Sequence, residues 1–437
     1  MSTGGIKYSA SSGWLDPPGD PSPALAGELE CDVAIIGGGY TGMAAALRLA
    51  ERGTDVALLE SAFCGWGASS RNAGHLTPTI AGDPQVLATV YRRRARELIR
   101  FADTAVHFTE GLIERLGIEC EFEANGNVSA ALSAGQLRRA ARIARILSEA
   151  GADVEFVEGT DAGLPHAFLG GILERAGGIL NPDKFGRGLR EAVRDSSARV
   201  FERTAVQAIE PSGPRVVVSA PGGRVLAERL VLATNAYTRD LPFAPRRIVA
   251  PLWVTLAETE PIDPSRLDGT GWVSRAGVYT QHVILENYRP TARGTVLFGS
   301  RLPQPPRGPL GARHPDPAVV AEIVRGFHER FPSLRDVAPQ RAWGGWIAMT
   351  PSWLPVAGEA ATNILYAVGY NGHGLAQAPY LGTLVADRLA GDEPHDDLRV
   401  VWRERPRFAP APLFSAPALR AGWAIDRISD RFAHRRG

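Results

Sequence analysis

Six consecutive residues near the N-terminus have the types and spacing needed to bind a pyrophosphate. They form a G-x-G-x-x-G pattern: Gly37, Gly38, Gly39, Tyr40, Thr41 and Gly42. Gly37 permits a tight turn, Gly39 lets the backbone approach phosphate oxygens, and Gly42 lets a helix pack closely on a strand. Glu60 follows 23 residues after Gly37 and can accept hydrogen bonds from ribose hydroxyls. Its charge would repel a 2′-phosphate.

The residues around these glycines supply the elements that such a site requires. Residues 32–36 form a short apolar run typical of a buried parallel strand, and residues 43–52 carry Ala and Leu at helical spacing. Residues 56–59 form a second buried strand that ends at Glu60. A glycine pattern alone also matches an ordinary glycine-rich turn. Strand, helix, strand and acid in this order predict an adenine-dinucleotide site.

The segment after the second strand indicates which dinucleotide to expect. Residues 65–75 read GWGASSRNAGH, and such small and hydroxyl residues suit a backbone that wraps a large flat ligand. A nicotinamide-binding domain would continue with an amphipathic helix and a third strand instead. We therefore predict FAD as the cofactor. The predicted contacts from this region are Ser61, Gly67, Ala68, Ser69, Ser70, Asn72, Gly74, His75 and Leu76.

With these residues the chain resembles the flavin-dependent D-amino-acid-oxidase superfamily, and within it the branch of glycine, sarcosine and γ-glutamylputrescine oxidases. The resemblance covers most of the chain and extends to residues 229–236 and 369–374. Residues 229–236 alone would fit an ordinary core strand and turn. The resemblance implies further cofactor contacts at Val206, Ala233, Thr234, Gly369, Asn371, Gly372, His373 and Gly374.

The resemblance also implies that the glycine loop at residues 369–374 lies against the flavin and that the following helix points its N-terminus at the pyrimidine ring. Two-electron reduction leaves negative charge there, which backbone N–H groups and a helix dipole stabilise. His373 could act as a base, although a loop histidine more often makes structural hydrogen bonds.

The predicted fold class is α/β, with a Rossmann-type FAD-binding domain and an α+β substrate domain built on a mixed or antiparallel sheet. A chain of 437 residues exceeds one ordinary core, so two closely joined domains are expected. The FAD-binding domain is assigned to residues 1–83, 156–244 and 336–395, the substrate domain to residues 84–155 and 245–335, and a helical tail to residues 396–437.

Composition excludes several other classes of function. The net charge of +1 gives no reason to expect nucleic acid or anionic lipid as a partner. Residues 1–30 contain no signal-peptide core and no run reaches membrane-spanning length, so we expect a cytoplasmic protein, monomeric or homodimeric. Cys31, Cys64 and Cys120 form no metal or redox motif. Cys64 could bond covalently to flavin, but a buried thiol and non-covalent FAD are the simpler expectation.

The substrate pocket is expected beneath strands at residues 249–257, 278–288 and 294–299. Alternation along residues 278–288 puts Tyr288, Glu286 and His282 on one face and Tyr279 with Arg289 on the other, and the sequence does not decide which face meets the flavin. Tyr279, Glu286 and Tyr288 are therefore all pocket candidates. Resemblance adds three residues that would surround the reacting group, namely His75, Trp346 and Tyr370, with packing against the flavin ring and no substrate contact as the alternative for each.

The cofactor implies oxidation of an amine C–N bond by hydride transfer to flavin N5, followed by hydrolysis of the imine, with O2 as the electron acceptor. Amino-acid oxidases of the family place an arginine where this chain has Ile347, so binding of a simple α-carboxylate is disfavoured. Sarcosine oxidases use a lysine to activate oxygen, whereas this chain has only Lys7 and Lys184. Two alternatives remain: an N-methyl- or D-amino-acid dehydrogenase that reduces a quinone or partner protein, and an accessory flavoprotein subunit.

Overall fold

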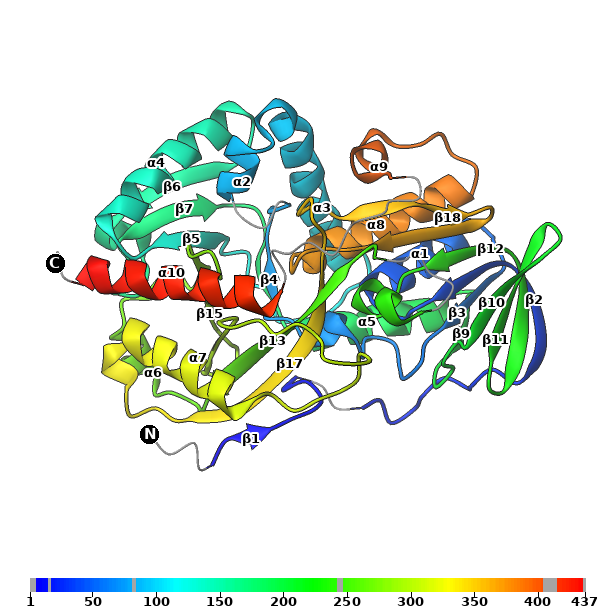
Figure 1. Cartoon of the computed structure of the whole chain (residues 1–437), viewed down its shortest axis with the longest axis horizontal. Coiled ribbons are helices and arrows are strands. Elements are labelled where there is room, and N and C mark those ends of the chain that lie inside the picture. Colours follow the sequence, from blue (N-terminus) through cyan, green and yellow to red (C-terminus); the bar gives the residue numbers. More distant parts are fainter. Residues whose placement is uncertain (1–4, 15–16, 81–83, 242–246, 404–414, 435–437) are drawn as a thin grey trace.

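Two large sheets organise the computed structural model, which describes residues 5–14, 17–80, 84–241, 247–403 and 415–434. In Figure 1 the strands of an eight-stranded sheet lie to the right and those of a nine-stranded sheet to the left. A third, two-stranded sheet pairs β4 (His75–Leu76) with β8 (Gly178–Ile179). The α/β fold class predicted from the sequence is confirmed by this arrangement.

The eight-stranded sheet has the parallel centre expected for dinucleotide binding. Its strands are β2 (Gly27–Ile36), β3 (Val56–Leu59), β9 (Arg199–Phe201), β10 (Ala208–Ser212), β11 (Arg215–Ala220), β12 (Gly223–Leu232), β18 (Val356–Ala361) and β19 (Ile364–Val368). β2 pairs in parallel with both β12 and β3, β3 pairs with β9, and β12 also pairs with β19. Their apolar runs are buried because helices cover the sheet.

Three helices of this sheet hold the cofactor motifs in place: α1 (Tyr40–Glu51), α5 (Pro182–Asp195) and α8 (Gly374–Leu389). α1 packs against α8 so closely that a Cβ at Gly382 would lie 2.3 Å from the carbonyl oxygen of Thr41. Two motifs more than 300 residues apart in the sequence are thereby fixed side by side.

The nine-stranded sheet has the order β1-β17-β13-β16-β15-β14-β5-β7-β6. Its strands are β1 (Lys7–Tyr8), β5 (Asn127–Ala131), β6 (Val154–Glu158), β7 (Gly170–Glu174), β13 (Ala250–Thr259), β14 (Gly277–Thr280), β15 (Asn287–Pro290), β16 (Val296–Gly299) and β17 (Pro339–Met349). β1, β6, β7 and β17 lie in one sheet with the strands of residues 245–335.

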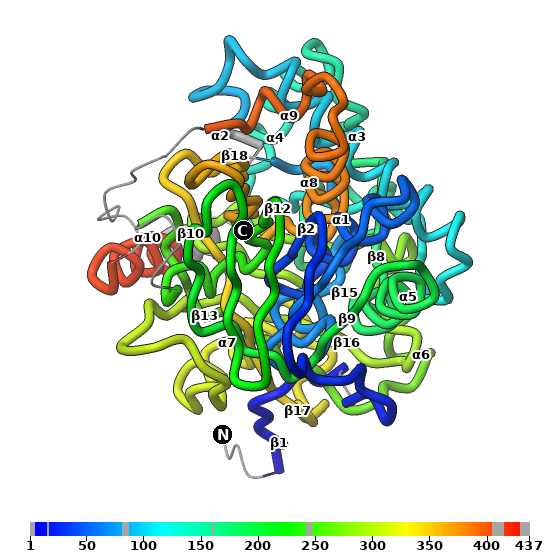
Figure 2. The backbone as a smooth tube through the Cα atoms, turned by 90° about the vertical axis from the view of Figure 1, so that its right-hand side faces the viewer, coloured from blue at the N-terminus to red at the C-terminus, as the bar shows by residue number. Residues whose placement is uncertain are grey.

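The remaining helices pack on this sheet, pack on α8, or lie at the surface. They are α2 (Pro84–Thr89), α3 (Ala95–Arg115), α4 (Ala134–Glu149), α6 (Pro264–Asp268), α7 (Pro317–Arg330), α9 (Asp396–Val401) and α10 (Ala416–His434), with short 3₁₀ turns η1 (Ala68–Ser70), η2 (Arg92–Arg94), η3 (Gly159–Ala162), η4 (Asn235–Asp240) and η5 (Pro332–Leu334). Within the described ranges, no helix is both long and apolar enough to cross a membrane. In Figure 2, α10 lies on the opposite side of the molecule from α5.

Two expected strands differ from the observed ones. The strand predicted over residues 278–288 is a hairpin, because β14 ends at Thr280 and β15 begins at Asn287. The sequence of residues 200–209 also predicts a single strand, but β9 ends at Phe201 and β10 starts at Ala208. In the first case the apolar residues Val283, Ile284 and Leu285 belong to the loop that connects the two strands.

Candidate active site

A cavity of about 940 Å³ is lined by residues from both large sheets and from each of the four sequence motifs. This volume is at the upper end of the range for small-molecule and cofactor sites. The glycine turn, the segment around His75, the end of β12 and the glycine loop before α8 all reach it. Segments far apart in the sequence therefore share one binding space.

The glycine turn packs closely against neighbouring backbone carbonyls and presents backbone N–H groups to a phosphate. Gly37 has a φ of +104°, and a Cβ there would lie 2.8 Å from the Ala233 carbonyl oxygen. A Cβ at Gly42 would lie 1.9 Å from the Gly37 carbonyl oxygen, so no larger residue fits. α1 begins after Gly39 without a side-chain cap. The Tyr40 N–H donates to the Ser69 hydroxyl at 3.0 Å, which leaves the N–H groups of Thr41 and Gly42 in the first turn for an anionic ligand.

Glu60 is held at the edge of the cavity by its own hydrogen bonds. One carboxylate oxygen accepts from the Gly38 N–H at 2.7 Å, and the other from the Ala62 N–H and the Ser61 hydroxyl, both at 2.9 Å. Burial raises the pKa of Glu60 above its ordinary value. Each carboxylate oxygen has more than one acceptor site, so these bonds leave capacity for ribose hydroxyls.

Arg71 is a cavity-lining residue that the sequence analysis did not select. It is 4% exposed, and its guanidinium donates to the carbonyl oxygens of Trp66 at 2.9 Å and Ala10 at 2.7 Å. Its Nη2 is buried without a hydrogen-bond partner in the described part of the chain. Leaving a charged donor unpaired is costly. Nη2 therefore fits a carbonyl or phosphate oxygen of a bound group.

The glycine loop before α8 is anchored on both sides. The hydroxyls of Tyr370 and Thr41 are 2.6 Å apart, which joins the loop to the first turn of α1. Asn371 has a φ of +52°, and its side chain accepts from the Thr350 N–H and donates to the Gly369 carbonyl, both at 2.7 Å. The loop is thus a rigid wall of the cavity.

His75 is held as a neutral imidazole. Its Nδ1 lies 2.9 Å from Oδ1 of Asn127, whose amide NH2 donates to the carbonyl oxygens of Leu76 and Gly178. These two bonds leave the Asn127 oxygen facing His75, so Nδ1 carries the hydrogen. Burial lowers the pKa of His75 to about 4, although the Asn127 hydrogen bond opposes this. His75 is therefore a poor proton acceptor at neutral pH.

Comparison with known proteins shows which family the chain belongs to. A family model described as "FAD dependent oxidoreductase" (DAO) matches residues 32–388. The chain belongs to this family of FAD-dependent oxidoreductases. The predicted resemblance is confirmed, and the family implies FAD as the cofactor. The glycine turn, Glu60 and the unpaired Nη2 of Arg71 have the chemistry to hold that dinucleotide.

Individual relatives agree with this assignment. Over 379 residues the chain is 31% identical to γ-glutamylputrescine oxidoreductase of Escherichia coli (strain K12), covering 85% of this chain and 86% of the relative. It is 25% identical to glycine oxidase of Geobacillus kaustophilus over 381 residues, covering 84% of this chain and 95% of that relative. The crystal structure of glycine oxidase from Geobacillus kaustophilus matches with a TM-score of 0.73 at 22% identity, covering 87% of this chain and 100% of that one.

Most of the predicted FAD contacts lie at the cavity surface. Those that line it are Gly37, Gly39, Tyr40, Thr41, Glu60, Ser61, Gly67, Ala68, Ser69, Asn72, Gly74, His75, Val206, Ala233, Thr234, Asn371, Gly372, His373 and Gly374. Four others, Gly42, Ser70, Leu76 and Gly369, are not among the lining residues. Gly42 packs against the Gly37 carbonyl and Ser70 is 1% exposed, so these two residues support the backbone around the cavity and do not line it.

The predicted substrate residues divide into two groups. Trp346, Tyr370, Tyr279 and His373 line the cavity, with the Trp346 indole donating to the Gly311 carbonyl at 2.9 Å. Glu286 and Tyr288 are not among the lining residues. Tyr288 pairs with Val278 on the core face of the hairpin, and its hydroxyl donates to Glu286 at 2.7 Å.

Glu286 belongs to a buried ionic cluster outside the cavity. Its carboxylate accepts from Nε of Arg301 at 2.6 Å and Nε of Arg330 at 3.1 Å. Burial alone would raise the pKa of Glu286, but the two guanidinium groups outweigh it and lower the pKa to about 2. The carboxylate fixes the loop between β14 and β15, and the neighbouring loop residues Gln281 and His282 line the cavity.

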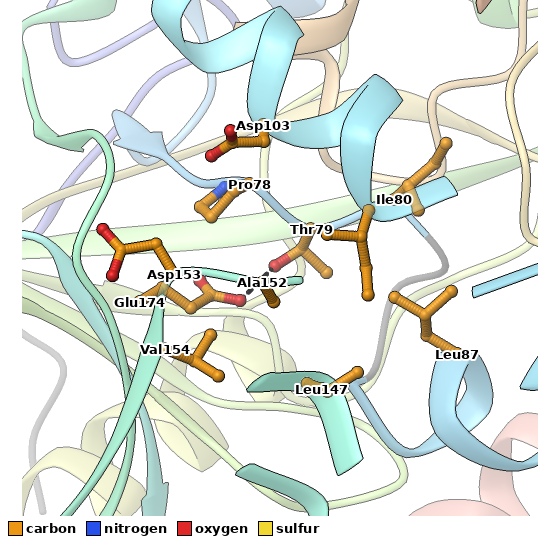
Figure 3. A pocket seen from close by; sticks show the side chains of 11 residues that line it. Pro78, Thr79, Ile80, Leu87, Asp103, Leu147, Ala152, Asp153, Val154 and Glu174 are labelled. Carbon is orange, nitrogen blue, oxygen red and sulfur yellow. Dashed lines mark hydrogen bonds between the residues drawn. The ribbon is translucent and has the colours of Figure 1, made fainter. Parts of the chain in front are cut away.

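A second, much smaller cavity lies beside Glu174 at the end of β7 (Figure 3). Its volume is about 30 Å³, enough for a water molecule. The Thr79 hydroxyl donates to Glu174 at 2.7 Å, and the Tyr279 side chain also interacts with this carboxylate. Burial raises the pKa of Glu174 to about 7.

Proposed function

We propose that this protein oxidises a C–N bond of a primary or secondary amine and transfers the electrons to O2. Bound FAD supplies the two-electron acceptor. The resulting imine is hydrolysed to a carbonyl compound and an amine. The proposal is supported by membership of the FAD-dependent family and by the relative named γ-glutamylputrescine oxidoreductase.

The scarcity of positive charge in the cavity lining supports an amine as the substrate in preference to a carboxylate. Among the described residues that line the cavity, Arg71 is the sole lysine or arginine. Its guanidinium already donates to backbone carbonyls of Trp66 and Ala10, and it packs 4.3 Å from the centre of the Trp66 ring. Ile347 lines the cavity as well and has no charge. A substrate carboxylate would therefore have few ionic partners, whereas a neutral amine needs none.

In this proposal the protein binds the amine in its unprotonated form and orients its α C–H bond. Enclosure lowers the pKa of a bound amine because burial disfavours the ammonium form. His75, Trp346 and Tyr370 surround the amine, and His75, with a pKa of about 4, adds no competing positive charge at neutral pH. The aromatic rings of Trp346 and Tyr370 offer faces for the substrate stem.

A dehydrogenase that reduces a quinone or partner protein is the second candidate. It is supported by the positions of the two lysines, which do not line the cavity. Lys7 and Lys184 are the two lysines of the chain, and the amino group of Lys184 lies 2.6 Å from Glu121. Neither is among the residues that line the cavity. A lysine that assists oxygen by its charge is thus missing from the described lining.

Anaerobic mixing of the FAD-loaded protein with candidate substrates tests the proposal. The panel contains γ-glutamyl amines, polyamines, N-methyl amino acids and D-amino acids, and loss of the flavin absorbance reports oxidation. Reduction by an amine, but not by the D-amino acids, is expected. Admission of air then separates the two candidates, since an oxidase recovers its absorbance rapidly. Failure of the whole panel would leave an accessory flavoprotein role in place of the proposed one.

We also propose that FAD is bound non-covalently. Cys64 is 4% exposed and is not among the residues that line the cavity. Burial raises the pKa of its thiol well above the ordinary value, so the reactive thiolate is scarce at neutral pH. A Cβ placed on Gly38 would lie 2.7 Å from its sulfur, which indicates a structural position beneath the glycine turn.

A further inference from the structure

An apolar cluster forms one wall of the large cavity on the side of the nine-stranded sheet. Leu252 of β13 and Met349 of β17 are 3% and 5% exposed, and the less buried Ile347, Trp353 and Leu419 pack against them. All five line the cavity. We call these five residues the apolar subsite. They come from β13, β17, the turn after β17 and α10, so the eight-stranded sheet contributes none of them.

The C-terminal helix α10 supplies the outer part of this wall. Ala418, Leu419 and Gly422 of α10 line the cavity. Further along the same helix, the Asp426 carboxylate accepts the backbone N–H groups of Val283 and Ile284 at 2.8 and 2.9 Å. The helix is therefore fixed to the loop between β14 and β15, which itself lines the cavity.

The contact between helix and loop is close and partly ionic. A Cβ at Gly422 would lie 3.3 Å from a methyl carbon of Val283, so the helix passes close to the loop at this glycine. Arg427 of α10 donates to Glu329 at 3.1 Å, and Glu329 also pairs with Arg301 of the ionic cluster around Glu286. These bonds hold Leu419 in place at the subsite.

The chemistry of the subsite selects against a charged group. None of its five side chains is ionisable, and Ile347 contacts the glycine loop, with its terminal methyl 3.9 Å from a Cβ placed on Gly372. A carboxylate bound here would lose its hydration without gaining an ionic partner. A methyl or methylene group bound against the same five side chains would be stabilised, because its apolar surface would be removed from water.

We propose that the apolar subsite binds an uncharged, apolar substituent of the substrate amine, and that Leu419 on α10 is a specificity-determining residue. The inference rests on the proposed amine oxidation and names the substrate class more closely. It places the amine group near His75 and Tyr370 and the apolar substituent against Ile347 and Leu419.

Amines without an α C–H bond test this inference by binding alone, since they are not oxidised. tert-Butylamine and α-aminoisobutyrate differ by one methyl group in place of a carboxylate, and longer tert-alkylamines extend the apolar stem. Binding is measured by the change in the flavin absorption spectrum of the FAD-loaded protein. tert-Butylamine should bind roughly tenfold or more tightly than α-aminoisobutyrate. Each added methylene should tighten binding roughly fourfold until the subsite is filled.

Three variants assign the effect to the subsite. Leu419→Ala should weaken binding of the longer amines roughly tenfold and leave tert-butylamine almost unchanged. Ile347→Arg should reverse the preference between tert-butylamine and α-aminoisobutyrate. Ile428→Ala, on the same helix at a residue that is 52% exposed and outside the cavity lining, is the matched control and should behave as the wild type.

The inference is overturned if α-aminoisobutyrate binds the wild type as tightly as tert-butylamine, or if chain length has no effect. It is also overturned if Leu419→Ala and Ile428→Ala give the same result. These measurements need no turnover. If every oxidisable amine fails to reduce the flavin while the dependence on chain length is observed, the proposed function fails and the subsite remains.

Discussion

Replacing Glu174 with Gln should stabilise the protein at alkaline pH and have little effect at pH 5. Glu174 is 4% exposed, and its carboxylate interacts with the side chains of Thr79 and Tyr279. The Gln carbonyl can keep the hydrogen bond from the Thr79 hydroxyl. The substitution therefore removes a buried charge without removing the neighbouring donor.

The direction and size of this change in stability follow from the pKa of Glu174. Burial raises that pKa from its ordinary value of 4.5 to about 7, so the folded state binds a proton more tightly than the unfolded chain. This contribution to stability is complete below about pH 4.5 and is lost as the pH rises through about 7. A shift of this size corresponds to about 3 kcal/mol. For a chain of 437 residues, that is roughly 3–4 °C in melting temperature.

Thermal unfolding of the FAD-saturated protein between pH 5 and pH 9 measures the effect. The wild type is compared with Glu174→Gln and with Glu155→Gln, whose side chain on β6 is 49% exposed and pairs with Arg175 at 2.5 Å. The melting temperature of Glu174→Gln should rise relative to the wild type as the pH increases, and that of Glu155→Gln should not. An advantage of Glu174→Gln that is constant or falls with pH would refute the buried-charge explanation.

Three other substitutions have clear expected results. Glu286→Gln should destabilise the protein by about 3–5 kcal/mol at neutral pH, because it removes the buried carboxylate that pairs with both Arg301 and Arg330. Since the pKa of Glu286 is lowered to about 2, the deficit in denaturant unfolding should shrink as the pH falls from about 4.5 towards 2. Gly42→Ala should abolish or greatly weaken FAD binding, measured by the ratio of flavin to protein absorbance, because its Cβ would lie 1.9 Å from a backbone oxygen. Cys64→Ser should still bind FAD, and acid precipitation should release the flavin from the wild type and variant alike.

The cofactor half of the site could be predicted from the sequence because its determinants are local. Gly37, Gly42 and Glu60 lie within one strand–helix–strand unit, where turn geometry and packing allow few alternatives. The segment around His75 was likewise recognisable from its run of small and hydroxyl residues. These residues meet in space largely because they are neighbours in the chain.

The substrate half was harder because it depends on turns and on pairing between distant segments. Alternation along residues 278–288 assumed one continuous strand, whereas the hairpin at residues 281–286 puts Glu286 in an ionic cluster instead of the cavity. Arg71 lay inside a recognised motif, but its unpaired Nη2 is evident only from the carbonyl groups around it. The role proposed for Leu419 requires α10 to lie against the cavity, which the expectation of a helical tail at residues 396–437 did not specify.

Strand register explains how the nine-stranded sheet controls the state of His75. Asn127 of β5 pairs with both Gly277 of β14 and Glu174 of β7, so these three positions form one row and share a face of the sheet. A Cβ at Gly277 would lie 2.4 Å from Nδ1 of His75 and 2.2 Å from Oδ1 of Asn127. The neutral imidazole therefore requires a glycine about 150 residues away from Asn127 in the chain. A slip of one residue between β14 and β5 would place a side chain there and separate His75 from Asn127.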